Sequence, residues 1–99
     1  MLEKNFTPKR TICKVTFSIP EEWADKEVKL AGDFNEWDKE EDTLEKKKDK
    51  WTITKRLKPE NTYRFRYLID GEKWENDDAA DKYVPNEFGT EDSVVEIGK

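Results

Sequence analysis

Tryptophan is the residue type whose placement in this 99-residue chain is most unusual, and there are four of them. Trp51 lies in a segment of alternating apolar and polar residues, and Trp23 follows another such segment. Trp37 lies in the polar stretch GDFNEWD, and Trp74 lies among charged residues after a hairpin signal. Two hypotheses are open for Trp37 and Trp74: each ring folds back as a lid over the core, or both are exposed as a flat aromatic platform.

An exposed aromatic platform beside a guanidinium group is suited to sugar rings. The axial C–H groups of a pyranose form an apolar patch against the ring face, while neighbouring donors bind the hydroxyls. Burying about 100 Å² of apolar surface at each indole contributes roughly 2.5 kcal/mol before costs. After the association penalty, two rings predict affinity on the order of micromolar to millimolar.

Residues for other chemistry are scarce. The chain has no His, which removes the usual general base near neutral pH and the commonest metal ligand. Cys13 therefore has no imidazole partner to activate it as a nucleophile. The acidic stretch 76–81 lacks the ligand spacing of a calcium loop, and the four glycines are isolated rather than grouped around a phosphate. We expect no enzymatic activity, no catalytic residues, no cofactor and no metal.

The composition is close to the limit for a folded protein, since 43% of the residues are charged and 33% are hydrophobic. Two features favour folding: 12% of the residues are aromatic, and 19 basic residues nearly balance 24 acidic ones. A chain of this length has room for one core. We expect a single domain over residues 1–99.

Partners and location are constrained by charge and by the single Cys. The net charge of −5 argues against nucleic acid, and the longest charged run, Asp38 to Lys50, mixes both signs as a solvated loop and edge strand would. Cys13 cannot form an internal disulfide, and its alternating segment predicts a buried side chain. The N-terminus has no signal-like apolar stretch and the chain has no 18-residue apolar run, so we expect a cytoplasmic protein that does not contact membranes.

Apolar residues recur with the period of two that is typical of half-buried strands. This alternation marks strands within residues 11–19, 28–30, 51–57, 63–69, 72–75 and 94–97. In the clearest run, 63–69, the aromatic residues share one face, and Arg64 and Arg66 project from the other. It ends at Asp70-Gly71, a strong hairpin signal. Six or seven short strands without a convincing helix predict an all-β fold, an immunoglobulin-like antiparallel β-sandwich.

Four ordered motifs extend this interpretation: VKLAGDFNEWD (28–38), YRFRYLIDGEKW (63–74), NDDAADKYVPNEFG (76–89) and TEDSVV (90–95). Together they resemble the isoamylase N-terminal-like early set domains, carbohydrate-binding module family 48. That family includes the glycogen-binding domain of the AMP-activated protein kinase β subunit and modules of branching and debranching enzymes. The resemblance covers about residues 12–97 and implies a non-catalytic β-sandwich that binds α-1,4-glucans such as glycogen or starch.

The resemblance also implies a set of carbohydrate-binding residues. Trp37 matches the first sugar-stacking tryptophan of the kinase-type domains, and Trp74 matches the second, with one extra residue after Gly71. Arg66 matches a basic residue, Lys in those domains, that hydrogen-bonds glucose hydroxyls.

Three further matches lie near the C-terminus. Phe88 matches an apolar residue, Leu in those domains, that reaches into the glucan, and Thr90 matches a threonine of the same loop. Asp92 stands where those domains have a ligand-bonding Asn; a carboxylate can accept a hydrogen bond from a hydroxyl but cannot donate one as the amide does.

The resulting hypothesis is a glycogen-binding module that stacks glucose rings on exposed tryptophans. Its partner would be an α-1,4-glucan or malto-oligosaccharide, together with a separately encoded glucan-metabolising enzyme or regulatory protein. The alternative is an immunoglobulin-like protein-interaction or accessory domain of glycogen metabolism that no longer binds sugar. This alternative predicts that Trp37 and Trp74 are buried or too far apart to touch one oligosaccharide.

Overall fold

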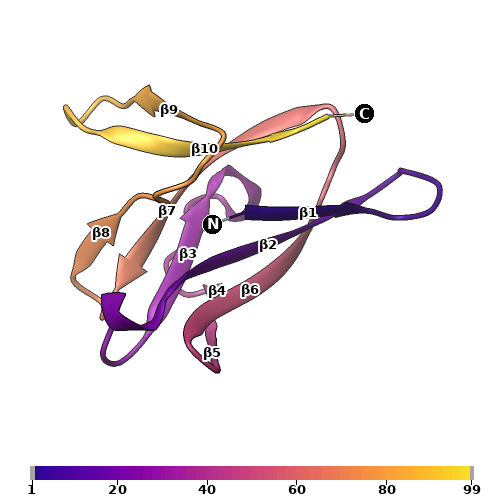
Figure 1. Ribbon diagram of the computed structural model, residues 1–99. Coiled ribbons are helices and arrows are strands. Elements are labelled where there is room, and N and C mark those ends of the chain that lie inside the picture. Colours follow the sequence, from indigo (N-terminus) through magenta and orange to yellow (C-terminus); the bar gives the residue numbers. More distant parts are fainter. Residues whose placement is uncertain (1, 99) are drawn as a thin grey trace.

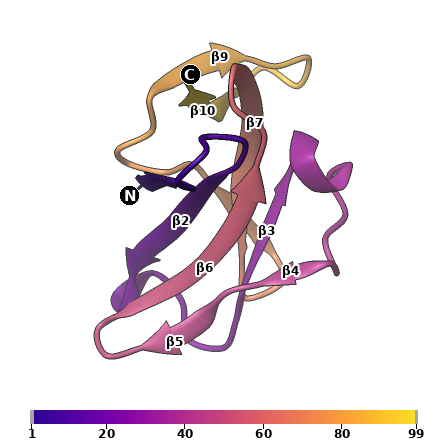
Figure 2. The same ribbon diagram turned by 90° about the vertical axis from the view of Figure 1, so that its right-hand side faces the viewer.

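The computed structural model describes residues 2–98, and over this range the chain forms two packed antiparallel sheets (Figures 1 and 2). The first sheet has the order β1-β2-β6-β5, with bounds Leu2–Phe6, Cys13–Pro20, Lys50–Leu57 and Glu45–Lys47. The second has the order β4-β3-β7-β10-β9, with bounds Asp42–Thr43, Val28–Gly32, Asn61–Ile69, Glu91–Ile97 and Lys82–Pro85, and β8 (Lys73–Glu75) also pairs with β7. The predicted all-β, immunoglobulin-like sandwich is confirmed.

The core lies between the sheets and is rich in aromatic residues, as the low aliphatic content requires. Phe17 of β2 meets Phe65 of β7 edge-on, with ring centroids 5.0 Å apart, and Phe65 meets Tyr67 in the same way at 5.7 Å. All three side chains are fully buried, and so is Cys13. The alternation therefore assigned the inward faces of β2 and β7 correctly.

Two strands have no clear alternation and were not predicted. β1 pairs along β2 from Leu2 opposite Phe17 to Phe6 opposite Cys13. The Lys4 ammonium also binds across to the second sheet: it donates to the Glu96 carbonyl of β10 at 2.8 Å and lies 2.6 Å from Oδ2 of Asp81, which precedes β9. β9 has one partly buried residue among exposed ones and pairs with β10. Pairing with a neighbouring strand, rather than burial of one face, defines both elements.

The charged run 38–50 crosses from one sheet to the other. It contributes β4 at the edge of the second sheet and β5 at the edge of the first, and the side chain of Leu44 between them is buried. The run therefore forms a largely exposed connection with two edge strands, where one edge strand was predicted. Within residues 2–98 we find no helix with the length and hydrophobicity needed to span a membrane.

The turn after β7 has positive φ at both central positions, 52° at Asp70 and 75° at Gly71, as the hairpin signal predicted. The Asp70 carboxylate accepts hydrogen bonds from the backbone amides of Asp25, Lys26 and Glu27. These bonds, led by that of Asp25, lower the pKa of Asp70 below its usual value. The stabilisation that these hydrogen bonds give is present above the usual pKa of Asp. It is lost as the pH falls through the lowered pKa of Asp70.

A buried polar pair lies near the same end of β7. The Tyr67 hydroxyl donates to Asp77 Oδ2 at 2.7 Å, and the Asp77 backbone amide donates to the Ser93 hydroxyl at 2.9 Å. Burial, and next the Asp77 carboxylate, raise the pKa of Tyr67 well above its usual value of 10.0. The native state therefore keeps the phenol protonated at a pH where the unfolded chain loses that proton.

We expect stability to fall as the pH rises above about 10, the usual pKa of tyrosine. A group whose pKa is higher in the folded state than in the unfolded state contributes stability that is fully present below the unfolded pKa. This contribution is lost as the pH rises from the unfolded pKa to the folded pKa. Tyr67 alone contributes a slope of about 1.4 kcal/mol per pH unit in the free energy of unfolding. Urea unfolding between pH 9 and 11 measures this slope in the unchanged protein and in Tyr67→Phe. Equal slopes would contradict the assignment.

Candidate functional site

An open cavity of about 910 Å³ lies on the outer face of the second sheet. Its floor is β7, from which Arg64 and Arg66 project on the side opposite the buried residues Phe65 and Tyr67. The structure brings together in its lining all six residues singled out from the sequence, namely Trp37, Arg66, Trp74, Phe88, Thr90 and Asp92. Segments up to 55 residues apart in sequence, from Trp37 to Asp92, thus form one surface.

The turn that carries Trp37 is held in an unusual backbone conformation. Glu36 and Trp37 have φ values of 57° and 59°, and such conformations cost about 1–3 kcal/mol each in non-glycine residues. The buried amide of Asn35 offsets this cost, because it accepts from the Gly32 amide at 3.0 Å and donates to the Leu30 carbonyl at 2.9 Å. The surrounding hydrogen bonds therefore fix where the Trp37 side chain leaves the backbone.

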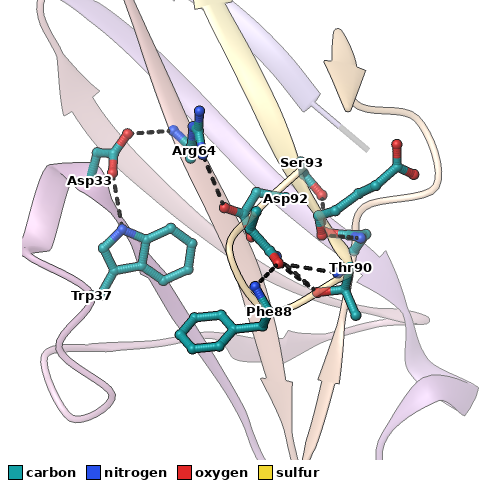
Figure 3. Close-up of polar contacts among 10 residues, drawn as sticks. Asp33, Trp37, Arg64, Phe88, Thr90, Asp92 and Ser93 are labelled. Carbon is teal, nitrogen blue, oxygen red and sulfur yellow. Dashed lines mark hydrogen bonds and ion pairs between the residues drawn. The ribbon is translucent and has the colours of Figure 1, made fainter. Parts of the chain in front are cut away.

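Asp33 fixes the orientation of the Trp37 ring. The indole Nε1 donates to Asp33 Oδ1 at 3.0 Å, and the backbone amide of Arg64 donates to Asp33 Oδ2 at 2.9 Å (Figure 3). One carboxylate therefore ties the indole to β7. The ring is thus linked to the cavity floor through Asp33 and is half-buried.

Trp74 and Arg66 form the opposite side of the cavity. Trp74 lies across the β7–β8 ladder from Leu68, and the guanidinium carbon of Arg66 is 5.8 Å from the centroid of its ring. Among the described residues, Arg66 Nε is the one buried side-chain nitrogen or oxygen atom without a hydrogen-bond partner. Leaving a buried donor unpaired costs about 1–3 kcal/mol, so this atom calls for an explanation.

The loop before β10 is organised by the Asn86 side chain. Its oxygen accepts from the amides of Phe88 and Thr90 at 2.9 and 3.2 Å, and its nitrogen donates to Asp92 Oδ1 at 3.0 Å. These bonds shape a tight loop that presents the Phe88 ring to solvent with 81% of its surface exposed. Phe88 is the most exposed large apolar side chain of the described residues.

Asp92 is buried and has protein partners on both carboxylate oxygens. Besides the bond from Asn86 to Oδ1, its Oδ2 lies 3.8 Å from Arg64 Nη1 (Figure 3). Asp92 thus connects the loop of Phe88 to the cavity floor. Its contacts with the protein account for the carboxylate at this position without a ligand.

The expectation that Trp37 and Trp74 are exposed is wrong. Both are half-buried, as is Trp23, and Trp51 is buried, so none of the four tryptophans is exposed. Asp33 links the Trp37 indole to the backbone of β7, while Trp74 lies beside Leu68 and the Arg66 guanidinium. The two rings line a concave cavity and do not form the flat platform that was predicted.

The sequence interpretation missed other lining residues: Asp33, Arg64, Pro85, Asn86 and Glu87. A signal existed for Arg64, because the alternation in 63–69 already placed it on the same face as Arg66. No pattern marks Asp33 or Asn86, since their roles depend on hydrogen bonds that form only in the folded turns.

A family model described as the glycogen recognition site of AMP-activated protein kinase matches residues 17–99. The chain belongs to this family. Membership confirms the resemblance stated above and identifies a carbohydrate-binding module, a class that is generally non-catalytic. No curated protein matches the sequence.

Proposed function

We propose that this glycogen-recognition module binds α-1,4-glucans in the 910 Å³ cavity, with Trp37, Arg66 and Trp74 as the central contacts. Phe88, Thr90 and Asp92 form the rim. The observation that carries the proposal is the open cavity that brings Trp37, Trp74 and the Arg66 guanidinium together, with the guanidinium carbon 5.8 Å from the centroid of the Trp74 ring. The Arg66 guanidinium lines this cavity and carries N–H donors for glucose hydroxyls.

The aromatic rings that offer contact area to a ligand differ from those expected from the sequence. Half-buried indoles offer a ligand less than the roughly 100 Å² per ring assumed for an exposed platform, because part of each ring already packs on protein. Phe88 offers nearly its whole ring. Two partial contacts and one nearly full contact in a concave site replace two full ones on a plane, and the expected affinity stays on the order of micromolar to millimolar.

The charges of the cavity favour a neutral ligand. Its lining carries three acidic residues, Asp33, Glu87 and Asp92, against two basic ones, Arg64 and Arg66. Arg64 Nη1 lies 3.8 Å from Asp92 Oδ2 and the Arg64 side chain is 48% exposed, so both guanidinium groups face the cavity as donors. An anionic sugar gains little from such a site, whereas an uncharged glucan meets both donors and acceptors.

Isothermal titration with maltoheptaose and glycogen tests the proposal. We expect saturable binding, with a dissociation constant on the order of micromolar to millimolar for maltoheptaose. Cellohexaose, the β-linked counterpart, is the control and should bind at least several-fold more weakly, because its flat chain fits a concave site poorly. Absence of binding by the folded protein at millimolar maltoheptaose would overturn the proposal.

The alternative, a protein-interaction or accessory domain that no longer binds sugar, required tryptophans that are buried or far apart. Trp37 and Trp74 are neither fully buried nor separated, since both line one cavity. A separately encoded glucan-metabolising enzyme or regulatory partner stays a prediction from the resemblance.

A further inference from the structure

A second cavity, of about 420 Å³, adjoins the first on the same face of the molecule. Trp74 lines both, so its indole forms the wall between them. The other residues of the second cavity are Glu27, Lys29, Asp38, Lys39, Glu40, Leu68, Gly71 and Glu72. A ligand that contacts Trp74 in the first cavity therefore lies next to the second.

The walls of the second cavity are fixed before any ligand arrives. Asp70 accepts from the amides of Lys26 and Glu27 at 2.7 and 3.1 Å, and its own amide donates to the Glu27 carbonyl at 2.8 Å. These bonds join the segment that carries Glu27 to the turn that carries Gly71 and Glu72. Binding to a preformed site loses less affinity to ordering than binding to a mobile one.

The opposite wall is held in the same way. Lys29 Nζ donates to the Thr43 hydroxyl at 3.0 Å and lies 4.0 Å from Glu40 Oε2. Leu68 of β7, which is 7% exposed, adds an apolar surface beside Trp74. The cavity thus combines an aromatic wall and an apolar patch with charged groups held at its edges.

The polar groups match an uncharged, hydroxyl-rich ligand. Four carboxylates, those of Glu27, Asp38, Glu40 and Glu72, can accept from hydroxyls, and two ammonium groups, those of Lys29 and Lys39, can donate. The excess of acid over base disfavours anions. These are the same preferences as in the first cavity.

We propose that the second cavity is an additional glucose subsite, occupied by the part of a linear α-glucan chain that continues past Trp74. This inference rests on the proposed function. It extends the ligand from a short oligosaccharide within one cavity to a neutral chain long enough to span both. Chain length then controls affinity.

Titration with maltotetraose and maltoheptaose tests the subsite. We expect the unchanged protein to bind maltoheptaose about fivefold to tenfold more tightly than maltotetraose. The double variant Lys39→Ala/Glu72→Ala removes one donor and one acceptor, both exposed, from the second cavity alone. It should lose most of that gain while its affinity for maltotetraose stays within about twofold of the unchanged protein.

A matched control separates a subsite from the statistical advantage of a longer chain. Glu3→Ala/Lys14→Ala removes the same two charges from exposed positions on the first sheet and should keep the full gain. An equal gain in both double variants, or equal binding of the two sugars by the unchanged protein, would overturn the subsite and leave the proposed function standing. If neither sugar binds at millimolar concentration, the proposed function fails and the subsite fails with it.

Discussion

The variant Trp37→Ala is expected to bind maltoheptaose about tenfold to fiftyfold more weakly than the unchanged protein and to remain folded. The indole lines the cavity and is half-buried, so its removal takes away ligand contact and costs the core little. The loss corresponds to about 1.4–2.3 kcal/mol, below the roughly 2.5 kcal/mol of a full aromatic contact. Isothermal titration gives the affinity, and thermal unfolding shows whether the fold is retained.

Trp23→Ala is the matched control for this experiment. Trp23 is also a half-buried tryptophan, but it packs against the core at η1 (Glu21–Trp23) and lines neither cavity. It should lower stability and leave the affinity for maltoheptaose unchanged. A folded Trp37→Ala protein with undiminished affinity would show that glucan, if it binds, binds elsewhere.

Much of the fold could be predicted because burial on one side of a strand leaves a pattern in the sequence. The strands β2, β6 and β7 alternate strictly enough that the buried faces of Phe17, Trp51 and Phe65 follow from spacing alone. The turn at Asp70-Gly71 was also predictable, since its positive φ values favour few residue types. β1 was not, because no apolar alternation marks it and its pairing with β2 is a long-range contact.

The sequence predicted residues that line the cavity, but it did not predict how their side chains are arranged. Motif resemblance and alternation placed Trp37 and Arg66 in one site, and the cavity brings them together. The orientation of Trp37 depends on Asp33, which bridges the indole and the Arg64 amide, and no local spacing signals that bridge. Whether a loop tryptophan is exposed therefore depends on the tertiary hydrogen bonds that it forms. The polarity of the residues next to it in the sequence does not reveal these bonds.

Gly32 affects both the stability of the fold and the position of the cavity. Gly32→Ala is expected to destabilise the protein by about 2–3 kcal/mol. Its φ of −172° is accessible to any residue, so the constraint is space. A Cβ at this position would lie 2.5 Å from the Arg64 carbonyl oxygen and 2.9 Å from Phe65 Cβ. Backbone atoms of β7 cannot move aside as a side-chain end can, so β3 and β7 must separate.

The midpoint of thermal unfolding should fall by roughly 10–20 °C, given about 4–8 °C per kcal/mol for a domain of this size. Gly98→Ala is the matched control, because a Cβ there meets no atom within 4 Å. Affinity for maltoheptaose should also fall in Gly32→Ala, even below its unfolding temperature. The strand pair that separates carries Arg64 and Arg66 on one side and the Trp37 turn on the other. If Gly32→Ala unfolds at the same temperature as Gly98→Ala, the close approach of β3 to β7 is not what positions the cavity.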